Sequence, residues 1–290
     1  MISVVIASRN RQKKLLKCVG SILKNRHLNF EVIIVDQTKS PIKNSVQNSC
    51  VRYFHRPGKG KSKALNIGIS KAQGSILAFT DDDCIVSKSW LNSIDNFFKQ
   101  HRDVDAVFGQ TFPYLPNNHS DLICPCCSKP FNKTSYFLFP IYHSKIGFGN
   151  NMAIKKNAIK KIGQFKEWLG PGTLVPAAED ADLIIRLMLK KIHLAKVPKI
   201  IVFHNNWLSH KEFNDLNKKY FLGEIGCYNY YSLKKLFFAK KILNRNFKNT
   251  TEAERVKSSI EKYFLFVFGV TISSFYYLID RIKNQNSIIN

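Results

Sequence analysis

Three consecutive aspartates, Asp81, Asp82 and Asp83, follow a short apolar run in the segment ILAFTDDDC. Like charges held this close together are costly to keep ionised, so something nearby must offset their repulsion. Carboxylate oxygens are the ligands that Mg²⁺ and Mn²⁺ prefer, particularly where the phosphates of a substrate complete the site. Alternatively, Asp82 or Asp83 begins the next helix, or the triplet is a solvated turn. Ser87 is a better N-cap for that helix, which favours the cation site.

Acidic side chains occur at two further positions that suit chemistry. Glu179 and Asp180, in AAEDADLIIRL, begin a predicted helix, where the helix dipole stabilises a carboxylate as the anion. Such a carboxylate can accept a proton from an attacking hydroxyl, although acids are also common at helix starts for structural reasons. Asp36 ends the run FEVIIVD. An aspartate at the end of the second strand of an α/β sheet often hydrogen-bonds a nucleoside, or is simply a polar strand end.

Hydrophobic periodicity predicts the elements that must position these acids. Runs rich in β-branched and aromatic residues predict strands at 2–6, 30–36, 51–55, 75–80, 105–109 and 195–207. Between them, apolar residues spaced three and four apart predict helices. This alternation predicts βαβ units and a mostly parallel sheet, so the fold class is α/β. Ligands of such sheets bind beyond the carboxyl ends of the strands, so Asp36 and Asp81–Asp83 are expected to face one crevice.

The charge balance of the chain predicts an anionic partner. Lys and Arg total 45 against 20 Asp and Glu, a formal net charge of +25. Nucleic acid, an anionic membrane face and phosphate-bearing substrates all fit this charge. In KKLFFAKKILNRNFK (234–248), basic residues alternate with apolar ones and no acid occurs. The apolar run 263–279 is short for a membrane span and favours a buried helix or an interfacial segment.

The cysteines favour a reducing compartment. The chain has 7 cysteines, an odd number, and it opens directly on a predicted strand instead of a secretory signal. Reduced thiols in the cytosol are therefore expected. Cys124, Cys126 and Cys127 form the cluster CPCC in a proline-rich irregular segment, 110–145. The cluster could be half of a zinc site, but ordinary thiols in a loop are the favoured interpretation because no second ligand pair follows closely.

The order and context of six segments resemble the family 2 glycosyltransferases of the GT-A fold. They are SVVIASRN, EVIIVDQTKS, KALNIGISKAQGSILAFTDDDC, GFGNNMAIKK, GPGT and AAEDADLIIRL, and they extend from residue 1 to about 190. The resemblance implies a Rossmann-like nucleotide-diphospho-sugar transferase fold with a helical, basic C-terminal extension. It implies a catalytic domain over 1–207, with a nucleotide-binding half (1–110) and an acceptor half (146–207), followed by a helical region, 208–290.

The resemblance also implies roles on the donor side. Asp36 would hold the base or ribose of a nucleotide sugar, with Ser8 near the base. Asp81 and Asp82 would bind the nucleotide sugar within the family's DxD-type motif, with Asp81 toward the ribose. Two departures from the family pattern bear on the base that is recognised. Ala7-Ser8-Arg9-Asn10 stands where Pro-Thr-Tyr-Asn is common, and Gln37 stands where a second acid is common.

A divalent cation, Mn²⁺ or Mg²⁺, is the implied cofactor. Asp83 would bind it on the diphosphate, and His204, in VFHNNW, lies where many members carry a histidine that approaches the metal or the diphosphate. A metal stabilises the charge of a nucleotide diphosphate leaving group as a Lewis acid. Lys61 and Lys63 could assist, although such lysines are more often solvated surface.

The acceptor side and the reaction follow from the same resemblance. Asp180 would be the catalytic base that deprotonates an acceptor hydroxyl for a direct, inverting displacement. Gly149, Asn150, Asn151 and Glu179 would line the acceptor side of the pocket. The implied partners are a nucleotide-diphosphate sugar, with a UDP-sugar favoured, and a glycan or lipid-linked acceptor of surface polysaccharide synthesis. The chain would then be cytoplasmic or peripheral on the inner face of the cell membrane, attached to its anionic surface.

Other functions fit the sequence less well. A Walker A motif fails because His55 stands where HRPGKGKS would need a glycine, and no G-x-G-x-x-G follows the first strand. The remaining alternative is a basic nucleic-acid- or membrane-binding protein with a degenerate transferase fold. No helix–turn–helix, zinc finger or aromatic RNP motif supports specific nucleic-acid binding, so none is expected.

Overall fold

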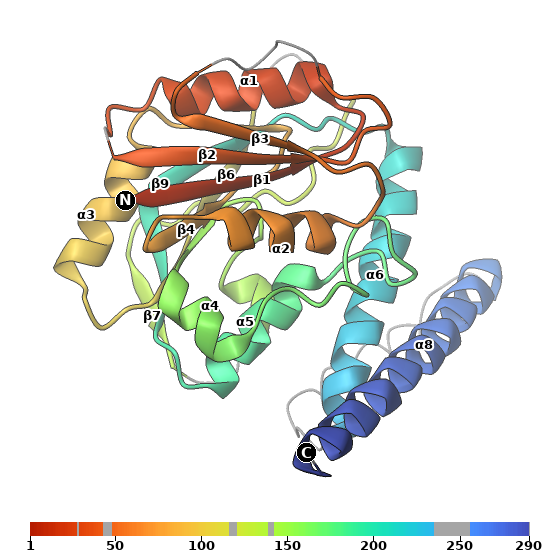
Figure 1. Cartoon of the computed structure of the whole chain (residues 1–290). Helices are drawn as coiled ribbons and strands as arrows, with labels where there is room; N and C mark the ends of the chain where they lie inside the picture. The colour runs from red at the N-terminus through yellow and green to blue at the C-terminus, as the bar shows by residue number, and fades with distance from the viewer. Residues whose placement is uncertain (28, 43–47, 116–120, 139–141, 235–255, 290) are drawn as a thin grey trace.

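A computed structural model describes the chain except residues 28, 43–47, 116–120, 139–141, 235–255 and 290. In the described part, nine strands form one sheet with helices on both faces (Figure 1). The strands are β1 Ile2–Ser8, β2 Phe30–Asp36, β3 Val51–His55, β4 Ile76–Phe79, β5 Cys84–Val86, β6 Ala106–Pro113, β7 Ser135–Phe137, β8 Met152–Lys155 and β9 Leu194–His204. The helices are α1 Gln12–Leu23, α2 Lys61–Lys71, α3 Trp90–Gln100, α4 Lys156–Ile162, α5 Glu179–Leu189, α6 His210–Leu233 and α8 Val256–Ile289. A short 3₁₀ turn, η2, spans His143–Lys145.

The sheet is mostly parallel, as the sequence predicts. Its order is β3-β2-β1-β4-β8-β6-β9-β5, and β7 also pairs with β9. The first four strands in this order are parallel to one another, and β6 and β9 run in the same direction. β8 opposes both β4 and β6, between which it lies. The α/β class is therefore confirmed, and the parallel strands end at one edge of the sheet.

Alternating strand residues divide the core into two layers. Successive side chains of a strand point to opposite faces. Thus Val4 and Ile6 pack with the apolar faces of α1 and α3, whereas Val5 packs with those of α2 and α5. Both faces are covered, which is why the strands read as continuous apolar runs instead of alternating ones.

Short strands are the main difference from the sequence-based expectation. β2 and β3 have the predicted bounds, but β5, β7 and β8 were not predicted, and each has three or four residues. β9 extends through Pro198 to His204. Its register with β6 shifts between Phe108 and Gln110, so the strand tolerates the proline at an irregularity.

The prediction that Ser87 caps the helix after the aspartate triplet is wrong. α3 begins at Trp90 with Ser89 as its N-cap, and β5 lies between the triplet and the helix. The hydroxyl of Ser87 is buried and has no hydrogen-bond partner among the described residues. The triplet therefore occupies the turn between β4 and β5 and does not begin a helix.

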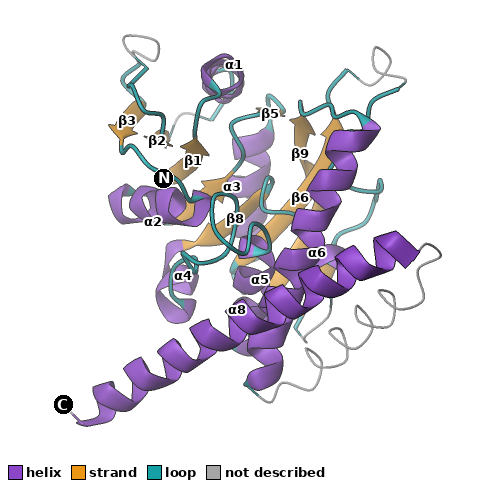
Figure 2. Ribbon diagram, turned by 90° about the vertical axis from the view of Figure 1, so that its right-hand side faces the viewer, coloured by secondary structure: helices purple, strands orange, loops and turns teal. Residues whose placement is uncertain are grey.

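The C-terminal helices lie beside the sheet. Ser209 and Glu212 form a capping box that starts α6. α8 crosses α6 in both views (Figures 1 and 2), with Gly269 facing Leu222 and Ile225 of α6. The small glycine lets the two helices approach closely. The basic segment predicted at 234–248 lies, except for its first residue, outside the described residues.

The opposite face of α8 is apolar and exposed. Phe264, Phe268, Phe275 and Leu278 are each between 46% and 68% exposed. By length and composition, Phe264–Ile282 could cross a membrane, and 11% of its most apolar stretch is buried in the protein. The helix, Val256–Ile289, is therefore longer than the run 263–279. Of the two expectations, a buried helix and an interfacial segment, its exposed apolar face fits the interfacial segment better.

Close packing of α2 on β1 can be tested at Gly68. A Cβ at this position would lie 2.3 Å from Cγ1 of Val5. We expect Gly68→Ala to destabilise the protein by about 1–3 kcal/mol through overpacking. Gly20→Ala in α1 is the matched control, because no heavy atom lies within 4 Å of the added Cβ. The control should be stabilised by ~0.5–1 kcal/mol. Equal urea midpoints for the two variants would contradict this packing.

Candidate active site

A cavity of about 670 Å³ opens at the carboxyl edge of the sheet. Most of the residues predicted as site residues line it: Ser8, Asp81, Asp82, Asp83, Gly149, Asn150, Glu179, Asp180 and His204. They come from β1, from the β4–β5 turn, from the approach to β8, from the start of α5 and from the end of β9. The fold therefore gathers into one crevice side chains that are up to about 200 positions apart in the sequence.

Arg11 offsets much of the charge of the aspartate triplet. Its Nη1 lies 3.1 Å from Oδ1 of Asp82 and 2.8 Å from Oδ2 of Asp83. The hydroxyl of Ser8 donates to Oδ2 of Asp82 at 2.8 Å. Burial and the charge of Asp83 nevertheless raise the pKa of Asp82 to about 6. Sequence reasoning missed Arg11, because an arginine before a helix carries no local signal of a partner some 70 residues away.

Lys61 links the triplet to the start of α5. Its ammonium lies 2.6 Å from Oδ1 of Asp81 and 3.3 Å from Oε1 of Glu179. Although burial opposes it, the charges of Asp81 and Glu179 raise the pKa of Lys61. Burial raises the pKa of Glu179, and the charge of Lys61 acts against this shift. The interpretation of Lys61 as solvated surface is therefore wrong, while Lys63 is exposed as expected.

His204 lies against Asp83. Its Nε2 is 3.3 Å from Oδ1 of Asp83, and its Nδ1 is 2.7 Å from the carbonyl oxygen of Pro125. Although burial opposes it, hydrogen bonds to Asp83 and Cys124 raise the pKa of His204 to about 10. Burial alone would raise the pKa of Asp83, but the hydrogen bond from His204 and the charges of His204 and Arg11 outweigh burial and lower this pKa. The two residues predicted to share a metal are thus neighbours, buried together at the end of β9.

Backbone donors hold the carboxylate of Asp180. The N–H of Gly149 donates to its Oδ2 and the N–H of Ala181 to its Oδ1, each at 2.8 Å. Ala178, the N-cap of α5, has a left-handed backbone with φ 69°. These two donors fix the position of the carboxylate at the start of α5. The cavity therefore contains one carboxylate that is fixed by main chain and lies apart from the triplet.

Asp36 and Asn151 do not line the cavity. Asp36 is fully buried, and its oxygens accept from the N–H of Thr38 at 2.9 Å and from the hydroxyl of Tyr53 at 2.6 Å. Its neighbour Gln37 faces the cavity. Asn151 accepts from the indole N–H of Trp90 at 2.9 Å and donates to two carbonyls of β6 and β9. Both residues hold the edge of the sheet together.

Helix α6 supplies one wall of the cavity. The wall residues are Leu216, Lys219, Tyr220 and Glu224. The hydroxyl of Tyr220 lies 3.0 Å from Sγ of Cys126, in the segment between β6 and β7. Sequence reasoning assigned no site residue to this helix, because its aromatic and charged positions read as an ordinary helical surface.

The sequence comparison identifies the family. The family model described as Glycosyl transferase family 2 matches residues 3–163. The chain belongs to this family. The matched residues include the strand ends and the triplet that bring the cavity together, and the predicted resemblance is confirmed.

Curated relatives match over shorter stretches. Glycosyltransferase GlyG of Streptococcus pneumoniae serotype 4 is 34% identical over 123 residues, which cover 39% of this chain and 40% of that protein. An uncharacterized glycosyltransferase of Haemophilus influenzae is 23% identical over 191 residues, covering 65% of this chain and 62% of that one. The match thus spans less than two thirds of either relative.

Solved structures of glycosyltransferases share the fold. TarS 1-349 of S. aureus superposes with a TM-score of 0.62 at 14% identity, covering 93% of this chain and 80% of that one. The mannosyltransferase PcManGT of Pyrobaculum calidifontis, in complex with GDP-Man and Mn²⁺, has a TM-score of 0.58 at 12% identity. This match covers 98% of this chain and 86% of that one. At such identities the likeness establishes the fold.

The bridging position of Lys61 makes a prediction about stability. Lys61→Met leaves Asp81 and the buried Glu179 without their shared cation, so we expect a loss on the order of 2 kcal/mol at pH 8. The loss should shrink toward pH 5, because protonation of Glu179, whose pKa is already raised, removes the uncompensated charge. Lys63→Met, which changes an exposed lysine of the same helix turn, should have little effect on urea unfolding. Similar losses in both variants at pH 8 would contradict the bridge.

Proposed function

We propose that the chain transfers a sugar from a nucleotide-diphosphate sugar to a hydroxyl group of a glycan or lipid-linked acceptor. The observation that carries this proposal is the pairing, in one cavity, of an aspartate triplet with a separate carboxylate held by main chain, that of Asp180. A transferase needs both, one to bind the anionic donor and the other to activate the acceptor. Membership of the family supports the same assignment.

The donor side fits a hard divalent cation, Mn²⁺ or Mg²⁺. Asp81, Asp82 and Asp83 offer the carboxylate oxygens that such ions prefer. Arg11 now compensates two of them, and its side chain is 47% exposed, so it can withdraw into solvent when a cation takes its place. Asp83 would hold the ion with His204 beside it. When bound, the cation supplies Lewis-acid stabilisation of the leaving diphosphate.

A UDP-sugar is the favoured donor. TarS 1-349 was solved in complex with UDP and with UDP-GlcNAc, and it superposes on more than four fifths of this chain. PcManGT was solved with GDP-Man, so the fold does not fix the base. In this chain Ser8 and Gln37 line the cavity, and we propose that they contact the nucleotide.

The acceptor side centres on Asp180. A carboxylate within hydrogen-bond reach of a bound hydroxyl can take its proton as the oxygen attacks the sugar. The backbone donors to Asp180 fix its position, and Gly149 and Asn150 form the neighbouring wall. Direct attack from the face opposite the leaving diphosphate inverts the anomeric carbon. Glu179, which forms an ion pair with Lys61, would help to position the acceptor and would not take the proton.

The exposed face of α8 supports a location on the inner face of the cell membrane. Phe264, Phe268 and Phe275 are exposed on this face. In the sequence Lys262 precedes the run 263–279, and Asp280 and Arg281 follow it. Apolar surface combined with positive charge is what an anionic lipid surface attracts. Lipid-linked acceptors of surface polysaccharide synthesis occur there, which joins the proposed location to the proposed reaction.

Donor binding is tested by thermal unfolding with UDP, dTDP, GDP or CMP, each with Mn²⁺, Mg²⁺ or EDTA. A ligand that binds the native state at 100 times its dissociation constant adds about 2.7 kcal/mol of stability. We expect one nucleotide to raise the melting temperature in a metal-dependent way, and Asp83→Ala to lose this rise. Asp95→Ala, on the remote helix α3, is the control and should respond like the wild type. No response to any nucleotide would contradict the donor assignment.

The assignment of the base is tested with Asp180→Asn. The amide keeps the shape of the side chain but accepts a proton poorly, so we expect transfer to fall by at least about 100-fold, within the range of general-base effects. Nucleotide binding should stay within a few-fold of the wild type. Asp95→Asn makes the same chemical change far from the cavity and should retain full turnover. Near-normal turnover by Asp180→Asn would eliminate this residue as the base.

Membrane attachment is tested with a triple variant, Phe264→Ser, Phe268→Ser and Phe275→Ser. We expect at least about a 10-fold loss of sedimentation with phosphatidylglycerol vesicles, since each ring would bury apolar surface in the lipid. The control changes Tyr136 and Leu138 to serine, which removes exposed apolar side chains near β7. Equal vesicle binding by the triple variant and the control would refute a role for this face of α8.

A further inference from the structure

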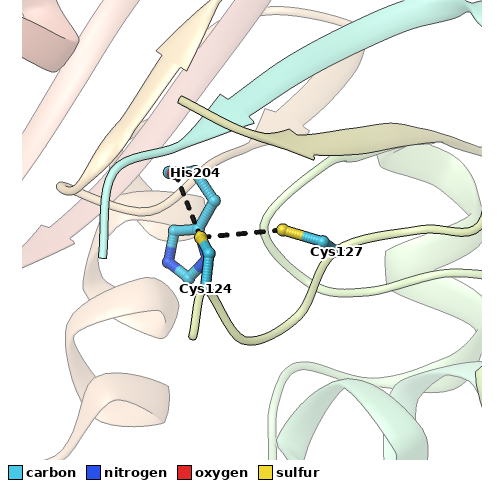
Figure 3. A group of neighbouring side chains, drawn as sticks. All are labelled: Cys124, Cys127 and His204. Atoms are coloured by element: carbon cyan, nitrogen blue, oxygen red, sulfur yellow. Dashed lines mark hydrogen bonds between the residues drawn. The ribbon is translucent and has the colours of Figure 1, made fainter. Parts of the chain in front are cut away.

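Two cysteines and a histidine meet next to the donor site. Cys124 and Cys127 lie in the connection between β6 and β7, and His204 ends β9. Their ligand atoms all lie within 4.8 Å of one another. Figure 3 shows the two thiols directed toward each other and the imidazole of His204 beside Cys124. The thiol of Cys124 donates to the carbonyl oxygen of His204 at 3.2 Å, which fixes the turn against the strand end.

The separation of the two sulfurs matches that of ligands to one metal. The Sγ atoms of Cys124 and Cys127 are 3.7 Å apart. Two thiolates bound to a tetrahedral Zn²⁺, with Zn–S bonds of about 2.3 Å, lie about 3.8 Å apart. The C-x-x-C spacing is also the spacing at which one turn of chain brings two thiolates to a zinc ion. Cys126, between them, points elsewhere, to the hydroxyl of Tyr220.

His204 can supply a third ligand without losing its orientation. Its Nδ1 faces the cysteine turn, 2.7 Å from the carbonyl oxygen of Pro125, while Nε2 faces Asp83. A metal-bound imidazole usually donates its other N–H to a carboxylate, which fixes the ring and its tautomer. If Nδ1 exchanges the Pro125 carbonyl for a metal, the hydrogen bond of Nε2 to Asp83 completes that arrangement.

We propose that Cys124 Sγ, Cys127 Sγ and His204 Nδ1 bind one Zn²⁺, with the fourth position open to water. Binding displaces the protons of both thiols and of Nδ1, so affinity falls as the pH falls. Thiolate ligands select soft or borderline metals over Mg²⁺ and Mn²⁺. The site is therefore separate from the hard-cation site of the proposed function. Here His204 orients Asp83 through Nε2 and is not itself a ligand of that second ion.

The bound zinc would tie a long irregular segment to the sheet. The connection from Pro113 to Ser135 contains no helix or strand among its described residues. In the described part it is held by a bridge between Ile123 and Leu208 and by hydrogen bonds such as that from the N–H of Thr111 to the hydroxyl oxygen of Ser128. A metal link from this segment to His204 would fix the wall of the cavity that carries Cys126.

Metal titration of the reduced full-length chain tests the proposal. Co²⁺ serves as the probe, because a tetrahedral site with sulfur ligands gives sulfur-to-cobalt charge-transfer bands in the near ultraviolet and strong visible bands. We expect one Co²⁺ per chain with these bands, and its displacement by one equivalent of Zn²⁺. Cys124→Ser and Cys127→Ser should lose the charge-transfer bands. His204→Gln should weaken Zn²⁺ binding by at least about 100-fold. Loss of a residue that only hydrogen-bonds a metal ligand already costs about 10–100-fold in affinity, and His204 is proposed as a ligand itself.

Matched controls separate this site from loose thiol binding and from the donor site. Cys126→Ser and Cys50→Ser keep both ligand thiols and should keep the full signal, and circular dichroism checks the folding of every variant. Asp83→Ala should keep the cobalt bands while losing the metal-dependent nucleotide response. The proposal is overturned if wild type and the Cys124→Ser, Cys127→Ser double variant bind Zn²⁺ equally, or if bound Co²⁺ lacks sulfur charge transfer.

Discussion

Compensation of negative charge at the carboxyl edge of the sheet is the interaction on which the site depends. Asp82 and Asp83 are each 4% exposed, a degree of burial that carboxylates tolerate only when cations lie against them. Arg11 and His204 provide this compensation, and Lys61 provides it for the neighbouring Asp81. They come from the start of α1, the start of α2 and the end of β9, so the turn after β4 is stable only when these three elements are in place.

The same arrangement explains the division of the cavity. Lys61 contacts a carboxylate on each side, Asp81 of the triplet and Glu179 of α5. Asp180, one residue further, turns to the backbone donors of Gly149 and Ala181 instead. One acid of the ED pair is thus held by charge and the other by main chain. The two neighbours consequently present different chemistry to a substrate, although they are adjacent in the sequence and in the helix.

Sequence patterns predicted the parts of the fold that depend on local periodicity. The bounds of β2 and β3 and the presence of helices between the strands follow from apolar spacing, because burial on a sheet imposes that spacing. The triplet, Glu179 and Asp180 were found because carboxylates at strand and helix ends are locally recognisable. Arg11 and the wall of α6 were missed, and Lys61 was named but interpreted as solvated surface, because their roles exist only through partners far along the chain. Asp36 has the expected place at a strand end, but Tyr53 and Thr38 occupy its oxygens.

The position of β8 has a consequence for synthesis on the ribosome. β4 pairs with β1 on one side and with β8 on the other, and β8 begins at Met152, some 70 residues after β4 ends. Until Met152–Lys155 emerges, the nascent sheet has a bare apolar edge at β4, and unpaired edges of this kind recruit other chains. β6 is synthesised before β8, so one of its edges also stays unpaired until β8 emerges. Slow translation between these strands therefore lengthens the period in which the N-terminal half is prone to aggregate.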